Sequence, residues 1–205
     1  MEFKKLFFRI SSQAADQLII YGVLKEGARA KDFEMTVLWL CDCGLLHKVY
    51  RVTSPNLPLR AYEDPRAFKL YMVDIGLLSC MSRLRQDTLL AGNTLFREFK
   101  GSLTEQFVLQ QLLTDKNLQI SYWTNDQGNA EVDFIVDNGK SVIPLEVKAE
   151  ENLQAKSLRV FVDKYRPGLA IRTSMTDYRK EDWLINLPLY AIETLGRKAA
   201  EDTHK

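Results

Sequence analysis

The sequence lacks the features of membrane-spanning and secreted proteins. No apolar run approaches the roughly 18 residues that a membrane span needs, and the first residues, MEFKKLFFRISS, do not have the layout of a signal peptide. Cysteine occurs only at Cys41, Cys43 and Cys80, without the spacing of a disulfide framework. We therefore expect a cytoplasmic protein that has free thiols and no membrane partner.

A large excess of one charge is also absent. The formal net charge is +1, which argues against a strongly basic surface over the whole molecule but leaves local basic patches open. The tripeptide Gly139–Ser141 resembles the end of a phosphate-binding loop, but such a loop needs a glycine where this chain has Phe134. We expect no ATP binding of that kind and assign Gly139 to a turn.

The length of 205 residues is enough for one large domain or two small ones. Residues 82–97 are polar and contain Gly92–Asn93, which predicts a connection between two folded parts. We therefore predict a first domain at residues 1–85 and a second at residues 86–205.

The first of these domains is predicted to contain a helix followed by two strands. Residues 31–46 have the apolar spacing of a helix that Gly44 ends, with a stripe formed by Phe33, Val37, Cys41 and Leu45, and by Leu38 beside them. Strands at LLHKVYRV and FKLYMVD follow, and Asp74 is placed to cap the helix IGLLSCMS. This order is winged-helix-like, and such a unit can dock on DNA or on another protein.

The stretch NAEVDFIVDNGKSVIPLEVKAE predicts two antiparallel strands, Glu131–Asp137 and Ser141–Lys148. β-Branched and aromatic residues lie on either side of Asn138–Gly139, a dipeptide that accepts positive φ in a turn. Because side chains alternate between the two faces of a strand, the predicted core face consists of Val132, Phe134 and Val136 on the first strand and Ile143, Leu145 and Val147 on the second.

The opposite face of this hairpin carries three charged side chains, Asp133, Glu146 and Lys148. Burial of an ionised group without a partner is costly, so these residues either lie at an exposed rim or form a site. Two carboxylates and a lysine can hold Mg²⁺, which prefers oxygen ligands, and the lysine can orient or help deprotonate a metal-bound water. The residues alone leave both interpretations open.

A fourth charged residue, Glu105, lies on a helix predicted at residues 98–114. The apolar stripe of this helix consists of Val108, Leu109, Leu112 and Leu113, and Glu105 falls in the middle of it. A core-facing glutamate needs a cation or a hydrogen-bond partner, or its pKa must rise. Near the start of a helix it can also reach the rim, where the helix dipole favours negative charge.

The elements after residue 97 are predicted in the order helix, three strands, helix, strand. The first strand is LQISYWT, the hairpin strands follow, the second helix spans residues 153–164, and the next strand is LAIRT at residues 169–173. A final strand is expected at LPLYAIE. The predicted class is therefore α/β.

Three stretches of the chain resemble the C-terminal half of bacterial and archaeal AAA-type ATP-binding proteins. They are KEGARAKDFEMTVLWLCDCGLLHKVYRVTSPNLPLRAYED, FKLYMVDIGLLSCMS, and GSLTEQFVLQQLL with AEVDFIVDNGKSVIPLEVKAE. In that family a P-loop ATPase domain precedes a winged-helix-like segment and a C-terminal domain of unknown function. The resemblance implies a PD-(D/E)XK, restriction-endonuclease-like αβββαβ core after a small winged-helix-like α+β segment, and the family's ATPase domain as a partner.

The same resemblance implies a site. Its catalytic residues would be Glu105, Asp133, Glu146 and Lys148, and Asp133, Glu146 and the carbonyl of Val147 would bind Mg²⁺ or Mn²⁺. The chain departs from the superfamily in two respects: Val132 stands where a proline precedes the first aspartate, and no Gln-x-x-x-Tyr pattern occurs on the following helix.

Two functions follow from these observations. The first is a metal-dependent nuclease, a phosphodiesterase that acts on DNA. The second is a non-enzymatic module that docks nucleic acid or a partner protein under the control of the ATPase domain, in which the four charged residues form an ion-pair cluster.

Overall fold

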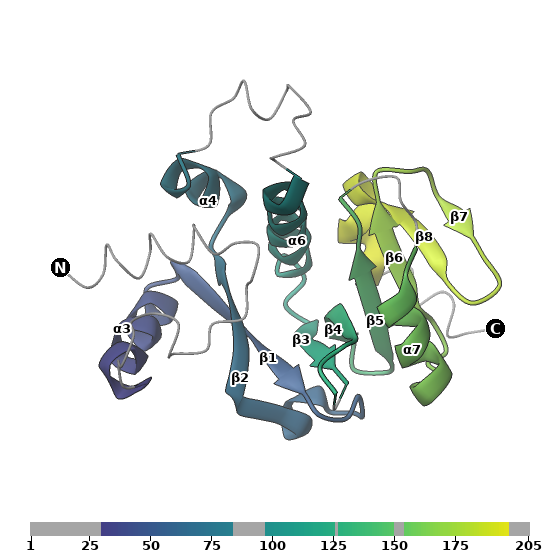
Figure 1. The fold of residues 1–205 in the computed structure, drawn as a ribbon, viewed down its shortest axis with the longest axis horizontal. Helices are drawn as coiled ribbons and strands as arrows, with labels where there is room; N and C mark the ends of the chain where they lie inside the picture. Colours follow the sequence, from purple (N-terminus) through teal and green to yellow (C-terminus); the bar gives the residue numbers. More distant parts are fainter. Residues whose placement is uncertain (1–29, 84–96, 126, 150–153, 197–205) are drawn as a thin grey trace. The chain divides into compact units, whose positions relative to one another are not determined.

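The computed structural model describes residues 30–83, 97–125, 127–149 and 154–196 (Figure 1). Helices and strands are interspersed along these residues, which confirms the predicted α/β class. In chain order the elements are α3 (Ala30–Asp42), β1 (Leu46–Val52), the 3₁₀ helix η1 (Leu59–Tyr62), β2 (Glu63–Met72), α4 (Ile75–Met81), α6 (Arg97–Leu112), β3 (Gln119–Thr124), β4 (Glu131–Asp137), β5 (Val142–Val147), α7 (Lys156–Tyr165), β6 (Ile171–Ser174), β7 (Arg179–Lys180), β8 (Ile185–Pro188) and the 3₁₀ helix η3 (Leu189–Thr194).

The eight described strands form one mixed sheet in the order β2-β1-β3-β4-β5-β6-β8-β7. Strands β3, β4 and β5 pair antiparallel, and so do β7 and β8. Parallel pairs join β1 to β3, β5 to β6, and β6 to β8. The carboxyl ends of β5, β6 and β8 therefore lie at the same edge of the sheet, and the residues that follow these strands are neighbours.

The predicted order of helix, three strands, helix and strand is observed as α6, β3, β4, β5, α7 and β6. The final predicted strand is wrong for most of its length, because LPLYAIE contributes only Leu187 and Pro188 to β8 and then continues as η3. Pro188 has no N–H for a sheet and so suits a strand end. The two-residue strand β7 was not predicted, since Arg179 and Lys180 are both exposed and carry no apolar signal.

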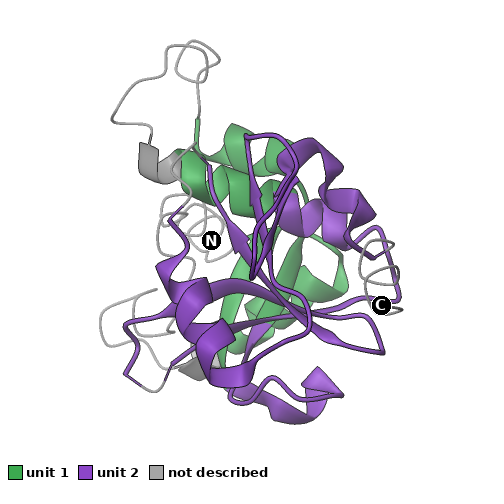
Figure 2. Cartoon of the chain, turned by 90° about the vertical axis from the view of Figure 1, so that its right-hand side faces the viewer, with its two compact units in different colours: residues 1–49, 66–107 green, residues 50–65, 108–205 purple. Residues whose placement is uncertain are grey.

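The chain divides into two compact units (Figure 2). Unit 1 comprises residues 1–49 and 66–107, and unit 2 comprises residues 50–65 and 108–205. The division passes through β1, β2 and α6, so each unit is built from two separate segments. The predicted boundary at residues 85–86 lies outside the described residues and stays a prediction, as does the connection at Gly92–Asn93.

In unit 1, helix α3 buries Val37 and Leu40 completely, whereas Leu38 and Trp39 are 44% and 55% exposed. The predicted place of Leu38 in the buried stripe is therefore wrong. Residues three apart share a helix face, and the face that contains positions 37 and 40 leaves position 38 outside. The predicted end is confirmed, because the helix stops at Asp42 and Gly44 adopts a φ of +74°.

Two side chains fix the ends of other elements in unit 1. The Asp74 carboxylate accepts a hydrogen bond from the Leu77 N–H at 2.7 Å, which confirms the predicted cap of α4. The buried Gln106 carboxamide bonds both backbone groups of Met72, accepting from its N–H at 2.9 Å and donating to its carbonyl at 2.8 Å. Gln106, which lies on α6, thereby provides hydrogen-bond partners for the backbone groups at the end of β2.

In unit 2, the predicted hairpin of β4 and β5 is confirmed, with Phe134 opposite Leu145 in an antiparallel register. Gly139 has a φ of +80°, as a turn glycine should. The Asn138 side chain accepts hydrogen bonds from two backbone N–H groups of the turn, those of Lys140 and Ser141. The local turn chemistry thus sets the register that positions the site.

A β-bulge interrupts the pairing of β4 with β3. Two residues of β4, Asp133 and Phe134, lie opposite the single residue Tyr122 of β3. The extra residue changes the alternation of faces, so Val132 packs in one core cluster with Ile135. The predicted common face of Val132 and Phe134 is therefore wrong.

The core cluster of unit 2 lies between the sheet and α7. Trp123 meets the rings of Phe161 and Tyr165 edge-on, with centroid distances of 5.2 and 5.8 Å. At the end of α6, Val108, Leu109 and Leu112 are buried as predicted, but Leu113 lies beyond the helix and is 39% exposed. None of the helices in the described ranges has the length and apolarity needed to span a membrane.

Candidate functional site

Glu146 is a buried carboxylate on β5, a strand with a neighbour on each side. The residue is only 5% exposed. Its Oε1 accepts a hydrogen bond from Lys148 Nζ at 2.6 Å, whereas its buried Oε2 has no hydrogen-bond partner among the residues that the structure describes. Positions two apart share a strand face, which explains why this pair meets. Glu146 therefore retains an acceptor oxygen that none of the described residues of unit 2 satisfies by hydrogen bonding.

The electrostatic surroundings of Glu146 are unfavourable for a single negative charge. Burial, followed by the charge of Asp133, raises the pKa of the Glu146 carboxyl to about 7, while Lys148 acts in the opposite direction. One ammonium group thus fails to compensate for the lost hydration and the second carboxylate. A further cation at this point would lower the pKa and complete the charge balance.

Asp133 lies in the bulge of β4. Phe134 is opposite Leu145 in the antiparallel pair of β4 and β5, so the next position along brings Asp133 beside Glu146. Its Oδ2 accepts a hydrogen bond from the Val147 N–H at 2.7 Å. The N–H and C=O of a strand residue point to the same neighbouring strand, so the Val147 carbonyl is also directed towards β4. The structure thus brings together Asp133, Glu146, Lys148 and the backbone of Val147.

Glu105 belongs to unit 1 and has partners there. Its Oε2 accepts a hydrogen bond from the Tyr71 hydroxyl at 3.4 Å and lies 3.9 Å from the Nζ of Lys69. Lys69 is only 4% exposed, so this glutamate has the cation that its place in the apolar stripe requires. Sequence reasoning missed Lys69, because a lysine in an apolar strand gives no sign of its partner. The role of Glu105 beside the other three residues stays a prediction.

The groups of unit 2 fit a hard divalent cation that keeps part of its water. Two carboxylates and a carbonyl supply oxygen ligands, and Mg²⁺ commonly binds through one or two carboxylates with water in its other positions. The orphaned Oε2 of Glu146 is the observation that favours such a ligand. Within the described ranges, no group of three or more His, Cys, Asp or Glu residues is arranged for a metal ion, so any cation here would rest on the two acids and the backbone.

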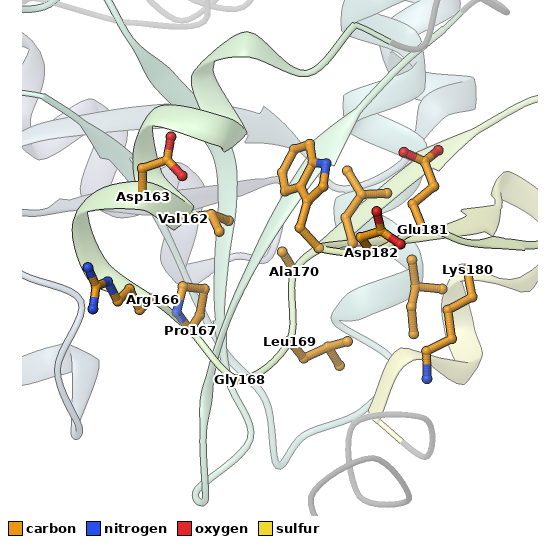
Figure 3. Close-up of a pocket in the computed structure, with 13 residues that line it drawn as sticks. Val162, Asp163, Arg166, Pro167, Gly168, Leu169, Ala170, Lys180, Glu181 and Asp182 are labelled. Atoms are coloured by element: carbon orange, nitrogen blue, oxygen red, sulfur yellow. The ribbon is translucent and has the colours of Figure 1, made fainter.

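A separate cavity of about 610 Å³ lies in unit 2, at the amino ends of β6 and β8. Figure 3 shows Asp163 and Arg166, at the end of α7, on one side of it and Lys180, Glu181 and Asp182 on the other. None of the predicted site residues lines this cavity. It was not predicted, because the segments that line it, within residues 162–170 and 180–185, carry no motif that indicates a cavity.

Comparison with known families places the candidate residues in one matched segment. Residues 100–191 match the family model DUF4143, a domain of unknown function, and this segment contains Glu105, Asp133, Glu146 and Lys148. Residues 1–88 match DUF8612, also a domain of unknown function. No curated protein and no solved structure matches the chain. The chain is thus similar to two families for which no function is established.

Proposed function

We propose that unit 2 is a metal-dependent phosphodiesterase domain that cleaves DNA. The observation that carries this proposal is the buried Glu146 carboxylate, which lies beside Asp133, pairs with Lys148 and has one oxygen without a hydrogen-bond partner in the described ranges. A purely structural buried charge is normally hydrogen-bonded throughout. A carboxylate that is buried yet under-satisfied suits a site that completes itself with Mg²⁺ or Mn²⁺.

Each residue of this proposed site has a distinct task. Asp133 and Glu146 would hold the cation with the Val147 carbonyl, and the hydrogen bond from the Val147 N–H would orient the Asp133 carboxylate. A bound divalent ion would stabilise the charge of a phosphodiester and lower the pKa of a bound water. Lys148, whose side chain is 29% exposed, would position the attacking water. The role that the sequence predicts for Glu105 stays a prediction.

The element order supports the proposed architecture. The elements α6, β3, β4, β5, α7 and β6 follow one another in the order αβββαβ. We propose that they form a restriction-endonuclease-like core and that the preceding helix and strands form its winged-helix-like companion. The DUF4143 match is consistent with the resemblance to the C-terminal region of AAA-type ATP-binding proteins. We therefore propose a cytoplasmic protein in which an ATPase domain is the partner of this chain.

The test is a cleavage assay on DNA with Mg²⁺ or Mn²⁺. Asp133→Asn, Glu146→Gln and Lys148→Ala should each reduce the rate by at least about 100-fold, the loss expected for groups that act on the reacting phosphate. Asp163→Asn is the matched control, because Asp163 is an exposed carboxylate in the same unit, with a side chain that is 60% exposed. Equal rates in all five proteins, or no metal-dependent cleavage by the unaltered chain, would remove the proposal.

A second candidate function is a docking module without catalysis. The short contact of Lys148 with Glu146 and the hydrogen bond of Asp133 to the Val147 N–H favour it, because they show that the cluster is partly closed by its own groups. If the cluster is only structural, Mn²⁺ should leave the unfolding temperature of the protein unchanged. A rise that disappears in Glu146→Gln would rule out a purely structural cluster.

A further inference from the structure

The cavity of about 610 Å³ in unit 2 lies away from the candidate metal site. Its lining comes from residues 162–170, which lead from α7 to β6, and from residues 180–185, which lead from β7 to β8 (Figure 3). Lys148 lies at the carboxyl ends of β5 and β6, so the length of a strand, roughly 13 Å for four residues, separates the two places. The volume is typical of small-molecule sites, which measure roughly 300–1,000 Å³.

The apolar part of the lining belongs to the core of unit 2. Ala170 and Leu184 are each only 2% exposed and are members of the core cluster, against which Val162 and Trp183 also pack. The Ile185 N–H donates a hydrogen bond to the Ala170 carbonyl at 2.9 Å, which joins the two lining segments. An apolar ligand would therefore contact a surface like the one that core side chains contact, and its burial there would be favourable.

A second link connects the two sides of the cavity. Arg159 Cζ lies 5.0 Å from the centroid of the Trp183 ring, and Arg159 Nε lies 3.0 Å from the Asp163 carboxylate on the same helix, α7. Asp163 and Trp183 both line the cavity. Because its two sides are joined before a ligand binds, the cavity loses less conformational entropy on binding than separate segments would.

Two of the three acids in the lining are paired with arginines that do not line the cavity. Asp163 pairs with Arg159, and Glu181 Oε1 accepts a hydrogen bond at 2.7 Å from Arg172, which is only 2% exposed. Asp182 is exposed, and the described residues provide no such arginine for it. The negative charge of the lining is thus largely compensated by the protein itself.

The two cations of the lining, Arg166 and Lys180, lie on opposite sides of the cavity (Figure 3). Both residues are exposed, and no ion pair or side-chain hydrogen bond within the described ranges involves either side chain. Arg166 also has a φ of +49°, in the left-handed region that favours glycine after a helix. Two cations against Asp182 leave the cavity complementary to a ligand with one negative group.

We propose that this cavity binds a small apolar carboxylate, with its acid group held by Arg166 and Lys180 and its apolar part against Ala170 and Leu184. A carboxylate accepts charge-assisted hydrogen bonds from both cations. A neutral ligand would leave both side chains without such a partner, and a cationic ligand would be repelled by them. The proposal does not depend on the nuclease function, because the metal site lies at the other edge of the sheet.

The test uses the full chain and three ligands of the same chain length: octanoate, the neutral octanol and the cationic octylamine. The readout is the displacement of the fluorescent apolar anion anilinonaphthalene sulfonate from the folded protein. The dye should bind, and octanoate should displace it at least about tenfold more effectively than either of the other two. This factor is the change in affinity that corresponds to one hydrogen bond to a charged group.

Two variants locate the binding, and a third is the matched control. Arg166→Gly and Lys180→Gln should each weaken the binding of octanoate by about tenfold. Arg166→Gly should not lower the unfolding temperature, because glycine adopts a positive φ without strain, so its loss of binding cannot come from unfolding. Arg179→Gln should bind as the unaltered protein does, since Arg179 is the exposed neighbour of Lys180 on β7 but does not line the cavity.

The proposal is overturned if the unaltered protein binds neither the dye nor octanoate, or if octanol or octylamine displaces the dye as well as octanoate does. It is also overturned if Arg166→Gly and Lys180→Gln both bind octanoate like the unaltered protein, because the ligand then lies elsewhere. An equal loss in Arg179→Gln would assign the effect to the net charge of the protein and remove the cavity as its cause.

Discussion

Two buried charges of opposite sign occupy paired positions on neighbouring strands, Glu146 on β5 and Arg172 on β6. Arg172 donates to Asn186 and to Glu181, both at hydrogen-bonding distance. Glu146 pairs with Lys148 through one oxygen, and no residue in the described part of the chain donates a hydrogen bond to its other oxygen. The two side chains are thus similarly buried, but the described residues provide hydrogen-bond partners for Arg172 more fully than for Glu146. We interpret Arg172 as part of the scaffold and Glu146 as part of a binding site.

The largest change in the free energy of unfolding should come from removing the Arg172 side chain, which has several hydrogen-bond partners. Arg172→Met leaves the Glu181 carboxylate and the buried Asn186 without their shared donor, and breaking a buried pair from one side costs about 3–5 kcal/mol. We expect the free energy of unfolding, measured by urea denaturation, to fall by this amount. A loss below about 1 kcal/mol, the range of exposed pairs, would contradict the distinction.

Substitution of Glu146 should have the opposite effect and raise the free energy of unfolding. Because the folded-state pKa of Glu146 is raised from 4.5 to about 7, the folded protein binds more protons than the unfolded one between these values. Its stability therefore falls as the pH rises through this window and is lowest above it. Without metal, Glu146→Gln should flatten this dependence and stabilise the protein by about 3 kcal/mol at pH 8, with little change at pH 4.

Denaturation curves at pH 4, 6 and 8 provide the measurement for this prediction. The same slope with pH in Glu146→Gln and in the unaltered protein would show that another group titrates in this range. A lower stability of the variant at pH 8 would show that the Lys148 contact outweighs the burial of the carboxylate.

An exposed pair should give the smallest effect. Arg159 and Asp163 lie 3.0 Å apart on α7, with side chains that are 52% and 60% exposed. Pairs of this kind on a helix contribute about 0.3–0.5 kcal/mol. Asp163→Asn should therefore change the free energy of unfolding by no more than that. A larger loss would mean that exposure is a poor guide to the importance of charges in this unit.

Local features of the chain could be predicted, and features that depend on distant segments could not. The β4–β5 hairpin and the cap at Asp74 follow from adjacent residues, so the meeting of Glu146 with Lys148 was within reach. The bulge that contains Asp133 depends on the pairing of β4 with β3, and strand alternation alone hides it. The partner of Glu105 on β2 is equally distant in sequence.

The scaffold charge shows the same limit. Arg172 lies in LAIRT, which the sequence identifies as a strand, but its partners Asn186 and Glu181 come from a segment whose strands were only partly predicted. A buried arginine is recognised as structural only when its acceptors are known. For this reason the hydrogen-bond network of Arg172 could not be predicted from the sequence.

Calorimetric titration with Mn²⁺ tests the central claim most directly. If Glu146 and Asp133 form an incomplete cation site, the unaltered protein should bind one Mn²⁺ per chain with measurable heat. Asp133→Asn and Glu146→Gln should abolish this binding, and Asp163→Asn should leave it intact. Absence of binding by the unaltered protein, or equal binding by all four proteins, would contradict the account and assign the cluster to the scaffold.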